Sequence, residues 1–287
     1  MRLAVMSDIH GNLPALEAVL NDLEQYKVDG IIVAGDLVGG PQTVEVTRLL
    51  RSLDSLMIRG NSDNGLLRYA AGEAPAYRYT HRQFALPRWI HHHTDRETLD
   101  FIQSLPDQRV VEIAGTVAVR VVHGSPRDPL EAIFPDHDPA TLDMALAQIN
   151  EPVLVCGHTH IPWKVERAGR LALNPGAVCG SRNGEVGAQY ALLIWDNGHW
   201  QVGHLTIPYD FERIRAAYRE SGLLEEGGAW ALAEMLGIET GQDVLEDFIS
   251  YAYGLTAEAG LQDCDAVPDD IWEHATATFD WNSYGSK

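Results

Sequence analysis

Five segments of this chain share one pattern, in which an apolar stretch of strand length ends in a turn that carries Asp, Asn or His. In one-letter code they are VMSDIH (residues 5–10), VAGD (33–36), IRGNSD (58–63), VVHG (121–124) and VCGHTH (155–160). Ligand sites of open α/β sheets form just beyond the carboxyl ends of strands. The pattern therefore predicts an α/β fold in which five strand ends converge on one crevice.

The order of the other elements agrees with this fold class. Buried strands are predicted over 2–7, 30–34 and 55–59, and helices over 12–25 and 43–53, the first of them capped by Asn12. Residues 64–105 are predicted to be helical and irregular. The first third of the chain thus alternates strand and helix, as parallel sheets require.

Later in the chain the alternation gives way to hairpins. Turn residues typical of hairpins occur at 114–116, 168–169 and 196–198. Strands are predicted over 109–113, 117–122, 153–156, 162–167, 170–173, 189–195 and 200–206. This order predicts two mixed sheets covered by helices. From about residue 208 the chain returns to helix, and Val244, Leu245, Phe248, Ile249 and Ala252 share one helix face.

Length and charge narrow the choice of function. A chain of 287 residues suits one large α/β domain with an appendage. Its formal net charge is −20, and residues 222–287 hold 14 acids and one base, so the acidity lies mostly in the C-terminal part. An acidic surface repels phosphate backbones, which argues against broad nucleic-acid binding.

The location of the protein is predicted from what the sequence does not contain. No apolar run approaches the roughly 18 residues of a membrane span, and the first residues become a strand without a signal peptide. The three cysteines, Cys156, Cys179 and Cys264, are odd in number and far apart, which favours a reducing compartment. We therefore expect a cytoplasmic protein without a membrane partner.

The five turns resemble the calcineurin-like metallophosphoesterase superfamily, whose pattern is Asp-x-His, Gly-Asp, Gly-Asn-x-Asp/Glu, His and Gly-His-x-His. The stretches SDIHGN (7–12), HGSPR (123–127), GHTH (157–160) and NPGAV (174–178) resemble its small bacterial and archaeal phosphodiesterase branch. The resemblance covers about residues 1–220. It implies a four-layer α/β/β/α sandwich of two mixed sheets over 1–221, followed by an acidic helical C-terminal extension over 222–287.

The resemblance also implies a pair of metal sites that share one carboxylate. One ion would be held by Asp8, His10, Asp36 and His160, and the second by Asp36, Asn61, His123 and His158. Imidazole and carboxylate ligands suit Mn, which we favour, or Fe, Ni, Co or Zn, rather than Ca or Mg. The cofactors would be two divalent transition-metal ions, and a hydroxide bridging them would attack phosphorus. Asp36, Asn61 and His123 are the expected catalytic residues.

One position departs from the family pattern. In much of the superfamily a His that can protonate the leaving group follows Gly-Asn, whereas this chain has Ser62. A hydroxyl is a poor general acid near neutral pH. The departure favours phosphodiesters with good leaving groups over esters with basic alkoxide leaving groups, and it argues against a protein phosphatase.

Four further residues are candidate substrate contacts, with surface pairing as the alternative for each. They are Asn12, Arg59, Arg127 and Arg182, three of which offer the bidentate guanidinium fork that suits phosphate. The His tract at 91–93 is predicted to be a solvated loop. Cys156 is predicted to be a small buried residue. The same role is favoured for Cys179, with a position facing the site as the alternative.

For the C-terminal extension a structural role is favoured, with a lid that sets substrate specificity as the alternative. It is too acidic to attract a phosphate, but its apolar helix face and Trp230, Trp272 and Trp281 need cover. We expect it to dock on the catalytic domain or on a second copy of the chain, away from the metals.

Three functions remain open at this point. The first is a metal-dependent phosphodiesterase that hydrolyses a small nucleotide-like diester. The second is a phosphomonoesterase or dinucleoside polyphosphate hydrolase. The third is a metal-binding scaffold that uses the same fold for protein contacts, although the complete set of seven ligand positions argues against it.

Overall fold

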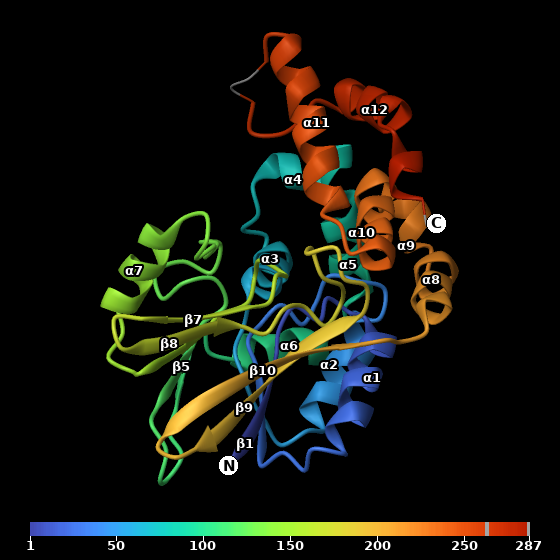
Figure 1. The fold of residues 1–287 in the computed structure, drawn as a ribbon. Coiled ribbons are helices and arrows are strands. Elements are labelled where there is room, and N and C mark those ends of the chain that lie inside the picture. Colours follow the sequence, from blue (N-terminus) through green and yellow to red (C-terminus); the bar gives the residue numbers. More distant parts are fainter. Residues whose placement is uncertain (262–263, 286–287) are drawn as a thin grey trace.

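The computed structural model describes residues 1–261 and 264–285 (Figure 1). Ten strands form two sheets of five, in the orders β10-β9-β1-β2-β3 and β4-β5-β6-β8-β7. The strands are β1 (Arg2–Met6), β2 (Gly30–Val33), β3 (Ser55–Met57), β4 (Arg109–Val111), β5 (Val119–Val121), β6 (Val153–Val155), β7 (Trp163–Arg167), β8 (Arg170–Asn174), β9 (Ala188–Asp196) and β10 (His199–Ile207).

The helices lie outside the sheets and in the C-terminal part of the chain (Figure 1). The α-helices are α1 (Leu13–Leu23), α2 (Thr43–Arg51), α3 (Asn61–Ala70), α4 (Ala76–Thr80), α5 (Ala85–His93), α6 (Arg96–Ser104), α7 (Pro139–Ala147), α8 (Phe211–Glu220), α9 (Leu223–Glu226), α10 (Gly228–Thr240), α11 (Val244–Glu258) and α12 (Asp269–Thr278). Two short 3₁₀ helices are η1 (Arg82–Phe84) and η2 (Trp281–Tyr284).

Both sheets are mixed, as predicted. In the first sheet β1, β2 and β3 are parallel, and β9 and β10 add an antiparallel hairpin. In the second sheet β5, β6 and β8 are parallel, with β4 and β7 antiparallel at the edges. The β7–β8 and β9–β10 turns have positive φ at Ala168-Gly169 and Asn197-Gly198, the conformation that tight hairpin turns require.

The side chains of each strand point alternately to its two faces and so hold the four layers of the sandwich together. In β1, Leu3 and Val5 face the second sheet, while Ala4 and Met6 face the helices of the first core. In β6, Leu154 packs toward α7 on the opposite outer face. Successive side chains of a strand point to opposite faces, so one apolar strand supplies two hydrophobic cores. The predicted α/β/β/α sandwich with a C-terminal helical extension is confirmed.

The extension packs on the sandwich through α10. Met235 and Ile238 belong to the same buried core as residues of α1, α2 and α5, and Leu223 before them is fully buried. The outer helices form a separate cluster in which the fully buried Phe248 packs edge-on against Trp272, with ring centroids 4.9 Å apart. The boundary at 221/222 stays a prediction, because residues on both sides of it share one core.

One predicted loop is helical. Residues 91–93 form the last turn of α5 instead of a solvated loop, and the ring of His93 stacks on Trp89 at a centroid distance of 3.9 Å. The amphipathic pattern of Leu86, Trp89 and Ile90, which are all buried, continues the helix into this tract. Across the described residues, no helix combines the length and apolar character needed to span a membrane.

Candidate metal centre

Five turns at the carboxyl ends of parallel strands form the site. The turns follow β1, β2 and β3 of one sheet and β5 and β6 of the other. Backbone hydrogen bonds join neighbouring turns, from Asp8 N to Gly35 O (3.0 Å) and from Gly157 N to His123 O (2.6 Å). The amide of His158 donates to Asp8 Oδ2 (3.1 Å) and so links the two sheets at the site.

Asp8 Oδ1 is the clearest sign that the site holds cations. This buried oxygen has no hydrogen-bond partner among the described residues, although three imidazole Nε2 atoms surround it. They belong to His160, His123 and His10, at 3.4, 3.8 and 3.9 Å. A buried carboxylate oxygen without a donor is costly unless a positive charge compensates it.

Asp36 lies between the two groups of histidines. Its Oδ2 is 3.5 Å from His10 Nε2 and 3.3 Å from His123 Nε2. Ser62 N donates a hydrogen bond to Asp36 Oδ1 (2.8 Å), and Ser62 Oγ donates one to the same Oδ2 that faces the imidazoles (2.9 Å). The carboxylate is therefore fixed with an oxygen aimed at both imidazoles.

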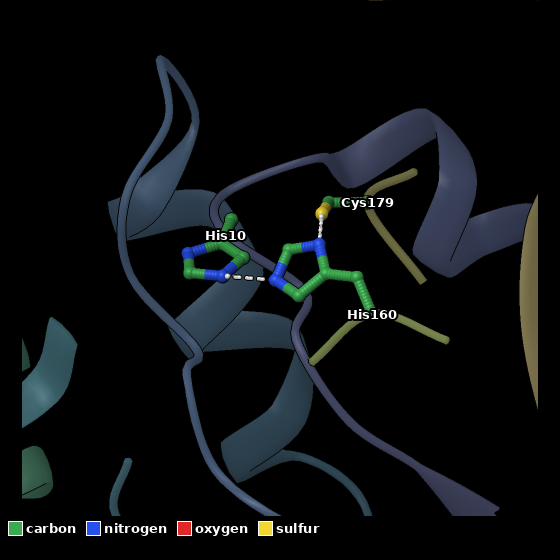
Figure 2. Close-up of side chains that lie close together, drawn as sticks. All are labelled: His10, His160 and Cys179. Carbon is green, nitrogen blue, oxygen red and sulfur yellow. Dashed lines mark hydrogen bonds between the residues drawn. The ribbon is translucent and has the colours of Figure 1, made fainter. Parts of the chain in front are cut away.

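The remaining predicted ligands complete the cluster. Asn61 Oδ1 lies 2.9 Å from His123 Nε2, and the rings of His123 and His158 are 5.4 Å apart between centroids. On the other side His10 Nε2 and His160 Nε2 are 3.2 Å apart (Figure 2). All seven residues predicted as metal ligands are thus brought together.

The imidazoles are oriented by backbone carbonyls. The Nδ1 atoms of His10, His123 and His160 lie 3.0, 2.8 and 3.1 Å from the carbonyl oxygens of Val38, Ala34 and Gly180. Since a carbonyl oxygen only accepts, Nδ1 carries the proton in each ring. Each ring therefore presents Nε2 to the site, which is the arrangement of metal-binding histidines.

Backbone strain is concentrated at the same residues. Eight non-glycine residues in the described ranges have positive φ, and five of them are predicted ligands: Asp8, His10, Asp36, His158 and His160. A left-handed conformation is costly for side chains with a Cβ atom. Strain of this kind persists where the surrounding structure enforces it, most often at functional sites.

The pKa values show that the two carboxylates attract positive charge. Burial alone would raise the pKa of Asp8 and Asp36, but the neighbouring imidazoles outweigh it and hold both pKa values well below the usual range. Burial alone would lower the pKa of His123, yet Asp36 and Asp8 raise it to about 10. Burial keeps the pKa values of His158 and His160 below normal. The donor set therefore fits divalent cations.

Gly60 is required by the close approach of its backbone to Asp36. A Cβ atom at residue 60 would lie 2.5 Å from Asp36 N and would also overlap the carboxylate. We expect Gly60→Ala to lower metal affinity at least about tenfold, because Asp36 must move. Gly65→Ala on the same helix is the control, since a Cβ there meets no atom within 4 Å. Isothermal titration with Mn²⁺ measures both; equal affinities in the two variants would contradict this expectation.

Two of the predicted substrate contacts are engaged elsewhere. Arg59 pairs with Asp107 at 2.9 Å, and Arg127 Nε donates to Glu131 Oε2 at 3.0 Å. Each guanidinium thus has a carboxylate partner outside the seven-residue cluster, which is the surface-pairing alternative.

Asn12 and Arg182 differ in their surroundings. Asn12 is fully buried; it caps α1, and its amide donates to Cys179 O (2.8 Å) and Tyr209 Oη (2.9 Å). With no exposed atom left, it positions the turn instead of contacting a substrate. Arg182 lies beside the cluster, since its backbone N donates to His160 O at 3.1 Å.

Two residues near the site received no role from the sequence. Asp63 accepts hydrogen bonds from Leu37 N (3.0 Å), Val38 N (3.2 Å) and Gly60 N (2.8 Å), which ties two ligand turns together. The Gly-Asn-x-Asp pattern in the sequence is the signal that could have identified Asp63.

Cys179 is buried, as predicted, but its Sγ is 3.8 Å from His160 Nδ1 (Figure 2). Cys179 thus lies against a predicted ligand, which is the alternative that the sequence left open.

The C-terminal extension also lies beside the site. A narrow crevice next to His160 and Cys179 is lined by Glu234 of α10 and by Asp243, the N-cap of α11. Burial would lower the pKa of Arg182, but these two carboxylates raise it. The expectation that the extension docks away from the metals is wrong, because its acids face a cation of the catalytic region.

Comparison with known proteins agrees with this site. Residues 1–198 match the model of the calcineurin-like phosphoesterase superfamily domain. An uncharacterized protein of Methanocaldococcus jannaschii, MJ0912, is 31% identical over 236 residues, which cover 76% of this chain and 90% of that protein. The chain belongs to the calcineurin-like phosphoesterase superfamily.

Two solved structures are similar to most of the chain. A metallophosphoesterase from Sphaerobacter thermophilus is 29% identical, with a TM-score of 0.67 over 84% of this chain and 99% of that one. The hypothetical protein PH1004 from Pyrococcus horikoshii is 22% identical, with a TM-score of 0.68 over 84% and 98%, and shows the shared fold. The family and the ligand clusters make this protein a metal-dependent phosphoesterase that uses divalent ions.

Proposed function

We propose that the protein is a dinuclear metal-dependent phosphodiesterase that acts on a small phosphodiester. The observation that carries the proposal is the buried, unpartnered Asp8 Oδ1, with three imidazole Nε2 atoms around it and Asp36 beside it. One ion would be held by Asp8, His10, Asp36 and His160, and the other by Asp36, Asn61, His123 and His158. When bound, the ions supply positive charge for the phosphoryl oxygens and an activated water as nucleophile.

The residues of the chain have separate tasks in this mechanism. Asp36 belongs to both ligand sets, and its carboxylate is held by Ser62 so that it keeps one orientation. The Asn61 amide oxygen and His123 complete the second set. Arg182 is next to His160 and carries a guanidinium suited to a non-bridging phosphate oxygen.

Because no strong general acid occupies position 62, esters with weakly basic leaving groups are favoured. The Ser62 hydroxyl donates to Asp36 Oδ2 at 2.9 Å, so its proton is already engaged. A leaving group that departs without a protonated side chain must itself be a weak base. This requirement is met by activated esters, such as aryl diesters, and less well by alkyl esters.

The mixed imidazole, carboxylate and amide donors support Mn²⁺ as the preferred ion, with Fe, Ni, Co and Zn as alternatives. The test combines metal analysis with turnover of bis(p-nitrophenyl) phosphate and p-nitrophenyl phosphate after reconstitution with each ion. We expect two ions per chain and a higher kcat/KM for the diester. A clear monoester preference would support a phosphomonoesterase, and metal uptake without turnover of either ester would support a scaffold.

Ser62→His is expected to reduce the dependence of kcat/KM on leaving-group pKa. An imidazole titrates near neutrality and can protonate the departing oxygen, so esters with basic leaving groups should gain most. A Brønsted series of aryl and alkyl diesters measures the slope for both proteins. Ser62→Ala, which also removes the hydroxyl but adds no acid, is the control; an equal slope in all three proteins would contradict the argument.

A further inference from the structure

A second cavity lies between the 77–84 segment and the C-terminal helices. Its volume is about 350 Å³, within the roughly 300–1,000 Å³ of small-molecule sites. Figure 1 shows α4 beside α11, and Gln83 bridges the two regions by accepting a hydrogen bond from Val267 N at 2.9 Å. The aromatic residues of its lining are Tyr77, Phe84, Trp230 and Tyr253.

This cavity adjoins the narrow crevice beside His160. Arg182, Asp243 and Leu245 line both the cavity and the narrow crevice that contains His160 and Cys179. Arg182 is held by Asp243 at 3.3 Å. A substrate whose phosphate lies at the metals would have to extend past Arg182 to reach the cavity.

The charges around the cavity select a neutral ligand. Arg78 and Arg182 line it together with the three acids Asp243, Glu246 and Asp265, so an anion would meet carboxylates and a cation would meet guanidinium groups. Arg78 forms no ion pair within the described residues, its Nε is buried without a partner, and its guanidinium lies 5.2 Å from the Phe84 ring. A neutral aromatic ring with both donors and acceptors satisfies this lining.

We propose that the cavity is a nucleoside subsite, which receives the base of a nucleotidyl phosphodiester while its phosphate lies at the metal centre. The proposal rests on the phosphodiesterase function. Nucleobases have flat faces that stack on aromatic side chains and edges that both donate and accept hydrogen bonds. The C-terminal extension would then supply substrate specificity to the catalytic sandwich, through Trp230 and Tyr253 above all.

The test compares two diesters with the same leaving group, thymidine 5′-(p-nitrophenyl phosphate) and methyl p-nitrophenyl phosphate. In the wild-type protein, the ratio of their kcat/KM values should favour the nucleotide. The ratio should fall about tenfold in Tyr253→Ala, because a stacking surface is lost. Tyr251→Ala is the matched control: this tyrosine lies on the same helix but contacts Phe279 and Thr278 of the outer cluster, and the ratio should stay at the wild-type value.

Binding provides a readout that does not depend on turnover. Titration calorimetry with AMP should give an affinity about tenfold weaker for Tyr253→Ala than for Tyr251→Ala. If the wild-type protein binds AMP in this way but hydrolyses neither diester, the phosphodiesterase function fails and the nucleoside site stands. If the protein hydrolyses both diesters with no preference, or if both variants bind AMP equally, the nucleoside subsite is overturned.

Discussion

Replacing Asp36 with Asn is expected to lower kcat for diester hydrolysis by about 10³-fold or more, even at saturating metal. The carboxylate stands between His10 and His123, at 3.5 and 3.3 Å from their Nε2 atoms, so both ligand sets lose their shared negative charge. Two-metal catalysis depends on holding both ions at a fixed separation. Initial rates with bis(p-nitrophenyl) phosphate and the metal content of the variant measure the effect.

The control makes the same chemical change away from the site. Asp143→Asn removes a carboxylate that pairs with Arg167 on the surface of α7, and kcat should stay within about twofold. If Asp36→Asn bound two ions and kept a tenth or more of the wild-type kcat, the assignment of Asp36 as the shared ligand would be wrong.

Ending the chain after Ser221 is expected to abolish cooperative folding at 25 °C. The truncation removes Leu223, Met235 and Ile238 from the main core. Loss of a buried Leu, Ile or Met side chain costs about 2–5 kcal/mol each, against a total domain stability of about 5–15 kcal/mol. Differential scanning calorimetry and near-ultraviolet circular dichroism of the truncated protein measure the loss.

A truncation that removes fewer residues distinguishes the contributions of the two parts of the extension. A chain that ends at Leu261 keeps α10 and α11 and loses α12, whose residues belong to the outer cluster. It should still unfold in a cooperative transition, at a lower temperature. A Ser221 truncation with the wild-type melting temperature would show that α10 does not contribute to the stability of the sandwich.

The fold was largely predictable because its signals are local. The hairpin turns at 168–169 and 196–198 contain residues that accept positive φ, and both turns are observed. The stretches that end in ligand turns are strands with the expected parallel pairing. The helix at 91–93 was missed because three consecutive histidines give no periodic pattern, whereas Trp89 and Ile90 before them continue a buried face.

The positions of the candidate ligands were also predictable from local signals. The partners of the long side chains around them were not. A ligand in the first residues after a strand is fixed by that strand, so Asp8, Asp36 and His123 could be placed from the pattern alone. Arg59 and Arg127 have flexible side chains that reach several neighbours, and each pairs with a carboxylate nearby. Asn12 is adjacent to the ligand turn, yet its amide is used to hold Cys179 O and Tyr209.

The sequence by itself determined the two mixed sheets, the succession of strands along the chain and the turns that carry the candidate ligands, because strand burial and glycine-rich turns act over a few residues. Only the tertiary structure decided where the C-terminal extension lies. Its net negative charge suggested a position far from a phosphate site, but Glu234 and Asp243 face Arg182 beside His160. Net charge describes a whole segment, whereas docking depends on which individual carboxylates meet a buried cation and which apolar side chains fill the core.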